Sequence, residues 1–146
     1  MAELAVKNLV VHVDGKTVVG GASFVIKGGE IHVLMGPNGS GKSSLLNAIM
    51  GHPKYFVTEG EILLDGKNVN VLPTEQKARA GIFLSLQHLP EIAGVTLTNF
   101  LYRAYKSMKP EDAITPLDFY KRMEARAKEY GIDTTYLKKH LNAGLS

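Results

Sequence analysis

Residues 30–51 read EIHVLMGPNGSGKSSLLNAIMG and contain three patterns in succession. Residues 30–35 form a short apolar run of the kind found in buried central strands. Glycine and serine are frequent in residues 36–41. In residues 42–50 the apolar side chains recur at helical spacing, and Gly51 is a typical residue for ending a helix. The segment therefore predicts a strand, a glycine-rich loop and a helix, in that order.

The loop matches the pattern G-x-x-x-x-G-K-[ST] from Gly36 to Ser43. Its glycines let successive backbone N–H groups point inward, at the positive end of the following helix. Lys42 supplies a positive charge for the β- and γ-phosphates of a nucleotide, and the Ser43 hydroxyl can ligate a bridging Mg²⁺. The alternative is a glycine-rich turn that only caps a helix. The complete motif instead predicts a site for ATP and Mg²⁺ built from Gly36, Pro37, Asn38, Gly39, Ser40, Gly41, Lys42, Ser43 and Ser44.

Antiparallel hairpins are expected before and after this loop. Each is a pair of runs rich in apolar or β-branched residues around a strong turn dipeptide, Asp14-Gly15 in the first and Asp65-Gly66 in the second. The paired runs are residues 4–13 with 17–26 and residues 61–64 with 68–71.

The rest of the chain alternates one strand candidate with helices. Pro73 favours a helix start, and a short apolar run after Gly81 predicts a second buried strand. From Thr96 onward the periodicity is helical. The predicted elements are a helix at 74–80, a strand at 82–86, a loop at 87–94, and helices at 96–106, 116–130 and 134–141.

Composition restricts the class of protein. The 146 residues are 45% hydrophobic and 21% charged, which is typical of a soluble globular domain. The sequence has no apolar run long enough to span a membrane, and its N-terminus carries Glu3 instead of a basic leader, so a cytoplasmic location is predicted. Because cysteine is absent, this chain cannot hold a disulfide or a thiolate-bound metal cluster.

The net charge of +3 lies entirely in residues 95–146, which carry nine basic and six acidic residues. A basic segment can indicate nucleic-acid binding. Here the charges alternate in sign along residues 121–129, as on a solvated helix face, and no aromatic residues interleave with them as a base-stacking surface requires. No nucleic-acid partner is expected.

GPNGSGKSSL at residues 36–45, the hairpin before it, the loop with Gln87 and the final LNAGLS resemble the nucleotide-binding domain of ABC ATPases. Within that family, QHLPEIAGV at 87–95 is similar to the SufC branch, the ATPases of the Suf iron–sulfur cluster assembly system. The resemblance covers essentially the whole chain. It implies an α/β fold of the P-loop NTPase, ABC ATPase type, with an antiparallel β subdomain, a partial core sheet and a helical subdomain, truncated.

The resemblance also implies a domain division and further site residues. Residues 1–94 would form the nucleotide-binding core and residues 95–146 the helical subdomain. Gln87 would be the Q-loop glutamine, which reaches toward Mg²⁺ and the attacking water and would act in catalysis with Lys42. Leu145-Ser146 would begin the signature motif [LF]-S-G-G-E, whose serine contacts the γ-phosphate held by the other subunit of an ATP-bound homodimer. The implied partners are SufB–SufD-like scaffold proteins, docked on residues 87–94 and the helix from Thr96.

The sequence departs from the family pattern in two ways. The Walker B strand with its aspartate and catalytic glutamate, and the switch histidine, have no counterpart in these residues, so nucleotide binding without turnover is expected. Val13 stands where many ABC ATPases stack an aromatic ring on adenine, which predicts weak base selectivity. Tyr55 and Phe56 are expected in a core or an interface. The five histidines are expected to be structural, namely His12, His32, His52, His88 and His140.

Other functions stay open at this point. The 146 residues could be a nucleotide-binding module that does not hydrolyse ATP, or the ATP-binding subunit of an ABC transporter. A small-molecule kinase with the same phosphate loop fits less well, because no acceptor site is apparent. Direct insertion into a membrane is not expected.

Overall fold

The computed structural model describes residues 2–85 and 92–141. The chain divides into two compact units, Met1–Ser85 and Leu86–Ser146. The division at 94/95 inferred from the family resemblance concerns functional subdomains and stays a prediction. Each unit is considered by itself below.

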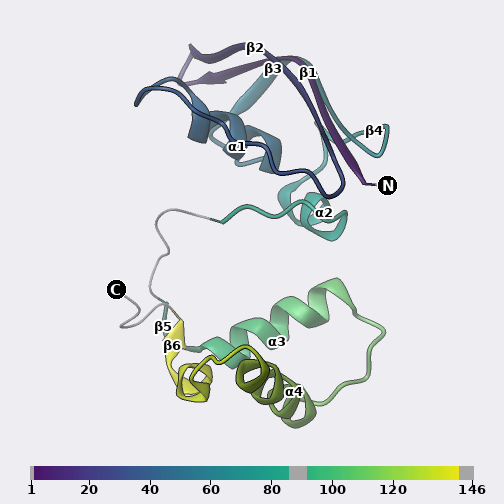
Figure 1. Cartoon of the computed structure of the whole chain (residues 1–146), viewed down its shortest axis with the longest axis vertical. Coiled ribbons are helices and arrows are strands. Elements are labelled where there is room, and N and C mark those ends of the chain that lie inside the picture. Colours follow the sequence, from purple (N-terminus) through teal and green to yellow (C-terminus); the bar gives the residue numbers. More distant parts are fainter. Residues whose placement is uncertain (1, 86–91, 142–146) are drawn as a thin grey trace. The chain divides into compact units, whose positions relative to one another are not determined.

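An antiparallel sheet forms the frame of the first unit (Figure 1). Both predicted hairpins are confirmed, with Asp14-Gly15 and Asp65-Gly66 as their two-residue turns. All four turn residues have positive φ, the conformation that matches the twist of the flanking strands. The strand order is β2-β1-β3-β4, where β1 is Glu3–Val13, β2 is Lys16–Lys27, β3 is Phe56–Leu64 and β4 is Lys67–Asn68.

Helix α1 (Lys42–Met50) packs on one face of this sheet, as Figure 1 shows. Its bounds are those predicted, and Gly51 ends it in the left-handed conformation with φ 82°. Leu46 departs from the predicted apolar stripe and remains exposed. The buried core residues shared by α1 and the sheet are Val6, Leu9, Val11, Leu45, Ala48, Ile49 and Ile62.

The two predicted buried strands on either side of α1 are not strands among the described residues. Residues 31–35 and 82–85 belong to no ladder of the described structure, and Ile31 and Phe83 are 92% and 86% exposed. An apolar run predicts burial, but a strand also needs neighbours to pair its backbone groups. In the described part of the chain no such neighbour reaches them, so these predictions are wrong for this structure.

These two segments border an apolar hollow of about 510 Å³ beside α1. Helix α2 (Thr74–Arg79) lies between β4 and the second segment in the chain and confirms the helix predicted there. The hollow is lined among others by Phe24, Ile26, Leu34, Leu46, Met50 and Phe83.

The second unit contains α3 (Leu97–Met108) and α4 (Pro116–Glu129), both close to their predicted bounds. Threonine side chains cap both helices: the Thr96 hydroxyl accepts the Asn99 N–H at 3.3 Å, and the Thr115 hydroxyl accepts the Asp118 N–H at 3.2 Å. Buried Phe119 packs its ring against the rings of Tyr102 and Tyr105, at centroid distances of 5.5 and 5.2 Å.

The predicted helix at 134–141 is wrong in its second half. A 3-10 helix covers Thr134–Lys138, and β6 (His140–Leu141) then pairs with β5 (Ile92–Thr96). The loop predicted at 87–94 is therefore wrong for residues 92–94, which belong to β5. The Lys139 carbonyl accepts the Leu97 N–H at 2.9 Å, so backbone pairing with a distant segment outweighs local helix propensity. In the two described ranges, no helix is long and apolar enough to cross a membrane.

Asp112 organises the connection between α3 and α4. Its carboxylate accepts hydrogen bonds from the Tyr105 hydroxyl and, at 3.0 Å, from the Ile114 N–H. The hydrogen bond from Tyr105, followed by that from Ile114, holds the pKa of Asp112 below its ordinary value. A carboxylate whose pKa is depressed by folding stabilises the fold above its unfolded pKa, and this contribution is lost as the pH falls through the folded pKa.

We therefore expect Asp112→Asn to lower the unfolding temperature at pH 7 and to weaken the loss of stability below about pH 4. Thermal unfolding followed by circular dichroism at pH 7 and pH 3 measures both effects. Exposed Glu111, the neighbouring acid, gives the matched control Glu111→Gln. Equal unfolding profiles for Asp112→Asn and the control would show that the carboxylate does not stabilise the connection.

We also expect the chain to self-associate through residues 31–35 and 82–85, since both expose apolar side chains and neither belongs to a β-ladder of the described residues. Sedimentation velocity over a range of concentrations should show oligomers, and the double change Ile31→Lys and Phe83→Lys should reduce them. Val71, equally exposed but outside both segments, provides the control Val71→Lys. A strictly monomeric wild-type chain at high concentration contradicts the prediction.

Candidate nucleotide-binding site

The glycine-rich loop leads from residues 31–35 into α1. Lys42 of the motif forms hydrogen bonds back to the start of this loop. The Nζ atom of Lys42 donates to the carbonyl oxygens of Gly36 and Pro37, at 2.7 and 2.8 Å. Within the loop, the Ser40 N–H donates to the Pro37 carbonyl at 3.3 Å. The ammonium group thus lies inside the curve of the loop, held by neutral oxygens.

Gly41 sets where α1 begins. It has φ 90°, and a Cβ at this position would lie 2.3 Å from the carbonyl oxygen of Val18 in β2. Any side chain would therefore collide with the backbone of the sheet. As the N-cap residue, Gly41 also has no side chain to accept a hydrogen bond from the first turn of the helix.

The first turn of α1 is consequently open to an anion. The first N–H groups of a helix have no partner inside the helix, and they carry the positive end of the helix dipole. No side chain of the described residues caps them at Gly41. Ser43 is exposed on this turn, and its carbonyl is fixed by the side-chain amide of Asn47 at 2.7 Å.

A hollow of about 350 Å³ lies under the loop. Side chains from β2, the end of residues 31–35 and α1 form its apolar floor, and the loop forms its polar rim. The residues that line it are Val19, Ala22, Leu34, Met35, Gly36, Pro37, Ser40, Gly41, Lys42 and Leu45. The arrangement combines open backbone donors, one ammonium group and nearby hydroxyls, which is the chemistry required to hold phosphate.

The structure brings together some of the predicted site residues. The loop residues 36–44 are contiguous at the start of α1. Gln87 and Ser146 lie outside the described residues, and so does His88. Among the described residues, no group of three or more His, Asp or Glu side chains could hold a metal ion.

Several residues that could be mistaken for site residues have structural contacts. The two ring nitrogens of His12 lie 2.8 and 2.9 Å from the hydroxyls of Thr58 and Thr17, which fits its predicted structural role. Tyr55 packs against the core of the first unit, whereas Phe56 is exposed. Val13 is half-buried at the end of β1.

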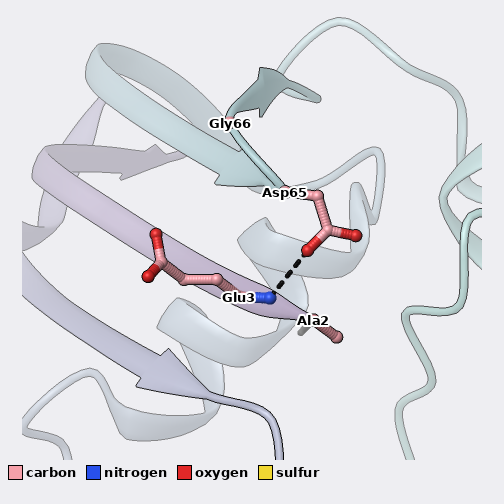
Figure 2. Close-up of a pocket in the computed structure, with 4 residues that line it drawn as sticks. All are labelled: Ala2, Glu3, Asp65 and Gly66. Carbon is pink, nitrogen blue, oxygen red and sulfur yellow. Dashed lines mark hydrogen bonds between the residues drawn. The ribbon is translucent and has the colours of Figure 1, made fainter.

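A third hollow, of about 540 Å³, is lined by Ala2, Glu3, Asp65 and Gly66. Figure 2 shows the Asp65 carboxylate turned to the Glu3 N–H, which donates to its Oδ1 at 2.7 Å, while the Glu3 carboxylate extends away. The Asp65 N–H in turn donates to the Glu3 carbonyl at 2.9 Å. These bonds join the β3–β4 turn to the start of β1. The Asp65 carboxylate therefore has a structural role.

One buried charged residue was missed by the sequence reading. Lys77 in α2 is 1% exposed, and its Nζ donates to the carbonyl of Ile49, in the last turn of α1, at 3.1 Å. A lysine in a short polar helix gives no signal of burial in the sequence, because the residue type is almost always exposed.

Comparison with known proteins identifies the family. Residues 19–143 match the family described as ABC transporter. The chain is 44% identical over 144 residues to Vegetative protein 296 of Bacillus subtilis, covering 98% of this chain and 55% of that protein. It is also 44% identical over 146 residues to the probable ATP-dependent transporter ycf16 of Cyanophora paradoxa, covering 98% of this chain and 56% of that protein. The chain thus spans about half the length of the curated relatives it matches.

A solved structure has the same fold. The crystal structure of a nucleotide-free ATP-binding cassette from an ABC transporter superposes on this chain with a TM-score of 0.63 at 24% identity, covering 100% of this chain and 60% of that one. The fold is accordingly that of an ABC ATPase, α/β with an antiparallel sheet and helices, over part of its length. The family match and the similarity of the relatives lead to one assignment: this chain belongs to the ABC transporter family.

Proposed function

We propose that this chain is the ATP-binding subunit, or part of it, of an ABC system, and that its nucleotide lies on the loop of residues 36–44. The observation that carries the proposal is the start of α1. There Gly41 leaves the first-turn N–H groups without a side-chain cap, next to the Lys42 ammonium. A hydrogen bond from the Lys42 ammonium to a charged phosphate oxygen is stronger than one to a neutral carbonyl oxygen. When ATP binds, its phosphate oxygens would therefore replace the carbonyls of Gly36 and Pro37 as the hydrogen-bond acceptors of Lys42.

Mg²⁺ fits the same site. The exposed hydroxyl of Ser43 is a hard oxygen ligand of the kind Mg²⁺ accepts. Mg²⁺ commonly keeps several waters and binds through few protein groups together with substrate phosphates, so a cluster of acidic side chains is not needed. Gln87 is the proposed second contact for the metal and for the attacking water, and Lys42 and Gln87 together are the proposed catalytic residues.

Within this family we propose that the system served is iron–sulfur cluster assembly, with a SufC-like role. The proposal is supported by the segment QHLPEIAGV at 87–95, which is similar to the SufC branch of the family. SufB–SufD-like scaffold proteins would be those partners. The complete protein would form a homodimer on ATP, with Ser146 at the start of the segment facing the second nucleotide.

An ABC transporter is the second candidate. Relatives 40% identical over 147 residues carry the name Probable ABC transporter ATP-binding protein in Streptococcus pyogenes. In that case a membrane partner would take the place of the scaffold. A nucleotide-binding module without hydrolysis is the third candidate. The SufC-like function requires a scaffold protein as partner, and the transporter function requires a membrane protein. Capture of the partner therefore distinguishes the two.

We expect Lys42→Ala to weaken the binding of Mg²⁺-ATP and Mg²⁺-ADP about tenfold to a hundredfold, because a charge-assisted contact to the phosphates is lost. Isothermal titration calorimetry on the 146-residue chain measures the affinities. Lys16→Ala, in an exposed residue at the start of β2, is the control. Equal affinities for the wild-type chain and Lys42→Ala would refute the nucleotide site.

We expect Ile92→Asp in the full-length protein to reduce capture of a SufB–SufD scaffold at least tenfold, since an apolar contact at an interface core is replaced by a charge. Ile92 begins β5 and is partly exposed. Ile132, an exposed isoleucine elsewhere in the same unit, gives the control Ile132→Asp. Capture of the scaffold that is unchanged by Ile92→Asp places the interface elsewhere, and capture of a membrane permease instead favours the transporter.

A further inference from the structure

Lys77 is the one charged residue that is buried among the residues the structure describes. Its side chain is 1% exposed, and none of the ion pairs of the described residues includes it. Its ammonium donates to the Ile49 carbonyl at 3.1 Å. The charge therefore faces the negative end of the α1 dipole, where a cation is favourable.

The contact between α2 and the end of α1 is tight. A Cβ on Gly51 would lie 3.2 Å from the Nζ of Lys77 and 3.4 Å from its Cδ and Cε. The Thr74 hydroxyl adds a second bond, donating to the Gly51 carbonyl at 3.0 Å. Two side chains from one turn of α2 thus bind two carbonyls at the C-terminal end of α1, and the absence of a side chain at Gly51 leaves room for that of Lys77.

The backbone of Lys77 points to a second segment. Its carbonyl accepts the N–H of Ile82 at 3.1 Å, and residues 82–85 lead toward Gln87. At its other end, α1 starts with Lys42 and Ser43. Lys77 is therefore bonded through its side chain to the C-terminal end of α1, the helix that begins at the phosphate loop, and through its backbone carbonyl to the start of residues 82–85.

Stability alone does not explain a lysine at this position. Desolvation lowers the pKa of Lys77 below its ordinary value, which shows that its charged form is disfavoured by burial. An apolar side chain of similar length would avoid this cost, because burying an isolated charge is unfavourable. Unlike an apolar residue, Lys77 places a hydrogen-bond donor on the carbonyl of Ile49.

We infer that Lys77 is a positioning residue that fixes the phosphate-loop helix relative to the segment leading to Gln87. This inference rests on the proposed function, because its consequence for ligands requires nucleotide at residues 36–44. By this inference α2 has a positioning role in addition to its packing. The helix would transmit the position of α1 to residues 82–85 through a single side chain and its own backbone carbonyl.

Three variants of the 146-residue chain test the inference. Lys77→Met keeps the length and removes the donor, Lys77→Arg restores a charged donor, and Lys54→Met removes an exposed lysine just beyond the same end of α1. Three quantities are measured for each: the unfolding temperature, the affinity for Mg²⁺-ADP, and amide hydrogen exchange of the nucleotide-free chain.

We expect Lys77→Met to keep or raise the unfolding temperature and still to weaken Mg²⁺-ADP binding about threefold to tenfold, because α1 is then less firmly positioned for the ligand. Amide exchange should become faster at Leu45, whose N–H is bonded to the Gly41 carbonyl, and at Ile82, whose N–H is bonded to the Lys77 carbonyl, and stay unchanged in β1 and β3. Lys77→Arg should recover part of the affinity, and Lys54→Met should match the wild type.

Unchanged exchange at Leu45 and Ile82 in Lys77→Met overturns the inference. So does faster exchange across the whole first unit with a lowered unfolding temperature, because that result describes a packing residue. If the wild-type chain binds no nucleotide, the proposed function fails, whereas the exchange measurement on the nucleotide-free chain still decides whether Lys77 positions the two segments.

Discussion

The approach of Gly41 to the carbonyl of Val18 is the contact on which the first unit depends. Only a residue without a side chain can stand where a Cβ would be 2.3 Å from a backbone oxygen. This contact seats the first turn of α1 against β2. From that starting point, the helical repeat directs Leu45, Ala48 and Ile49 into the core on the sheet. The same glycine leaves the helix N-terminus uncapped, so one constraint serves both the packing of α1 and the chemistry of its first turn.

Lysine ammonium groups bind carbonyl oxygens at both ends of α1, with opposite consequences. At the N-terminus Lys42 bonds to carbonyls of an exposed loop, and a phosphate can replace them at small cost because the ammonium is already near water. At the C-terminus Lys77 is buried and its partner is a helix carbonyl. Burial keeps water away from this contact, whereas water reaches the contacts of Lys42 at the exposed loop. The helix is thus held at one end and available for a ligand at the other.

The features that could be predicted from the sequence depend on local signals. Asp14-Gly15 and Asp65-Gly66 require positive φ whatever surrounds them, Gly51 ends α1 for the same reason, and Thr115-Pro116 defines the start of α4. The phosphate loop is equally local, since one contiguous motif carries it. The failures concern pairing between distant segments. The strand β6 exists because β5 lies beside it, and residues 31–35 form no strand because no neighbouring strand pairs with them. Neither outcome can be predicted from the local sequence of these residues.

The apolar extended segments and the nucleotide site share one backbone. Residues 31–35 end at Gly36, the first residue of the phosphate loop, and residues 82–85 end two positions before Gln87. Any strand that pairs with these segments would fix the backbone just before the residues proposed to meet ATP. Conversely, a nucleotide held by the loop, as proposed, would order the end of residues 31–35, which lowers the conformational entropy that pairing of this segment must still remove. Pairing of residues 31–35 and binding of the nucleotide would then favour each other, even where neither adds a contact to the other.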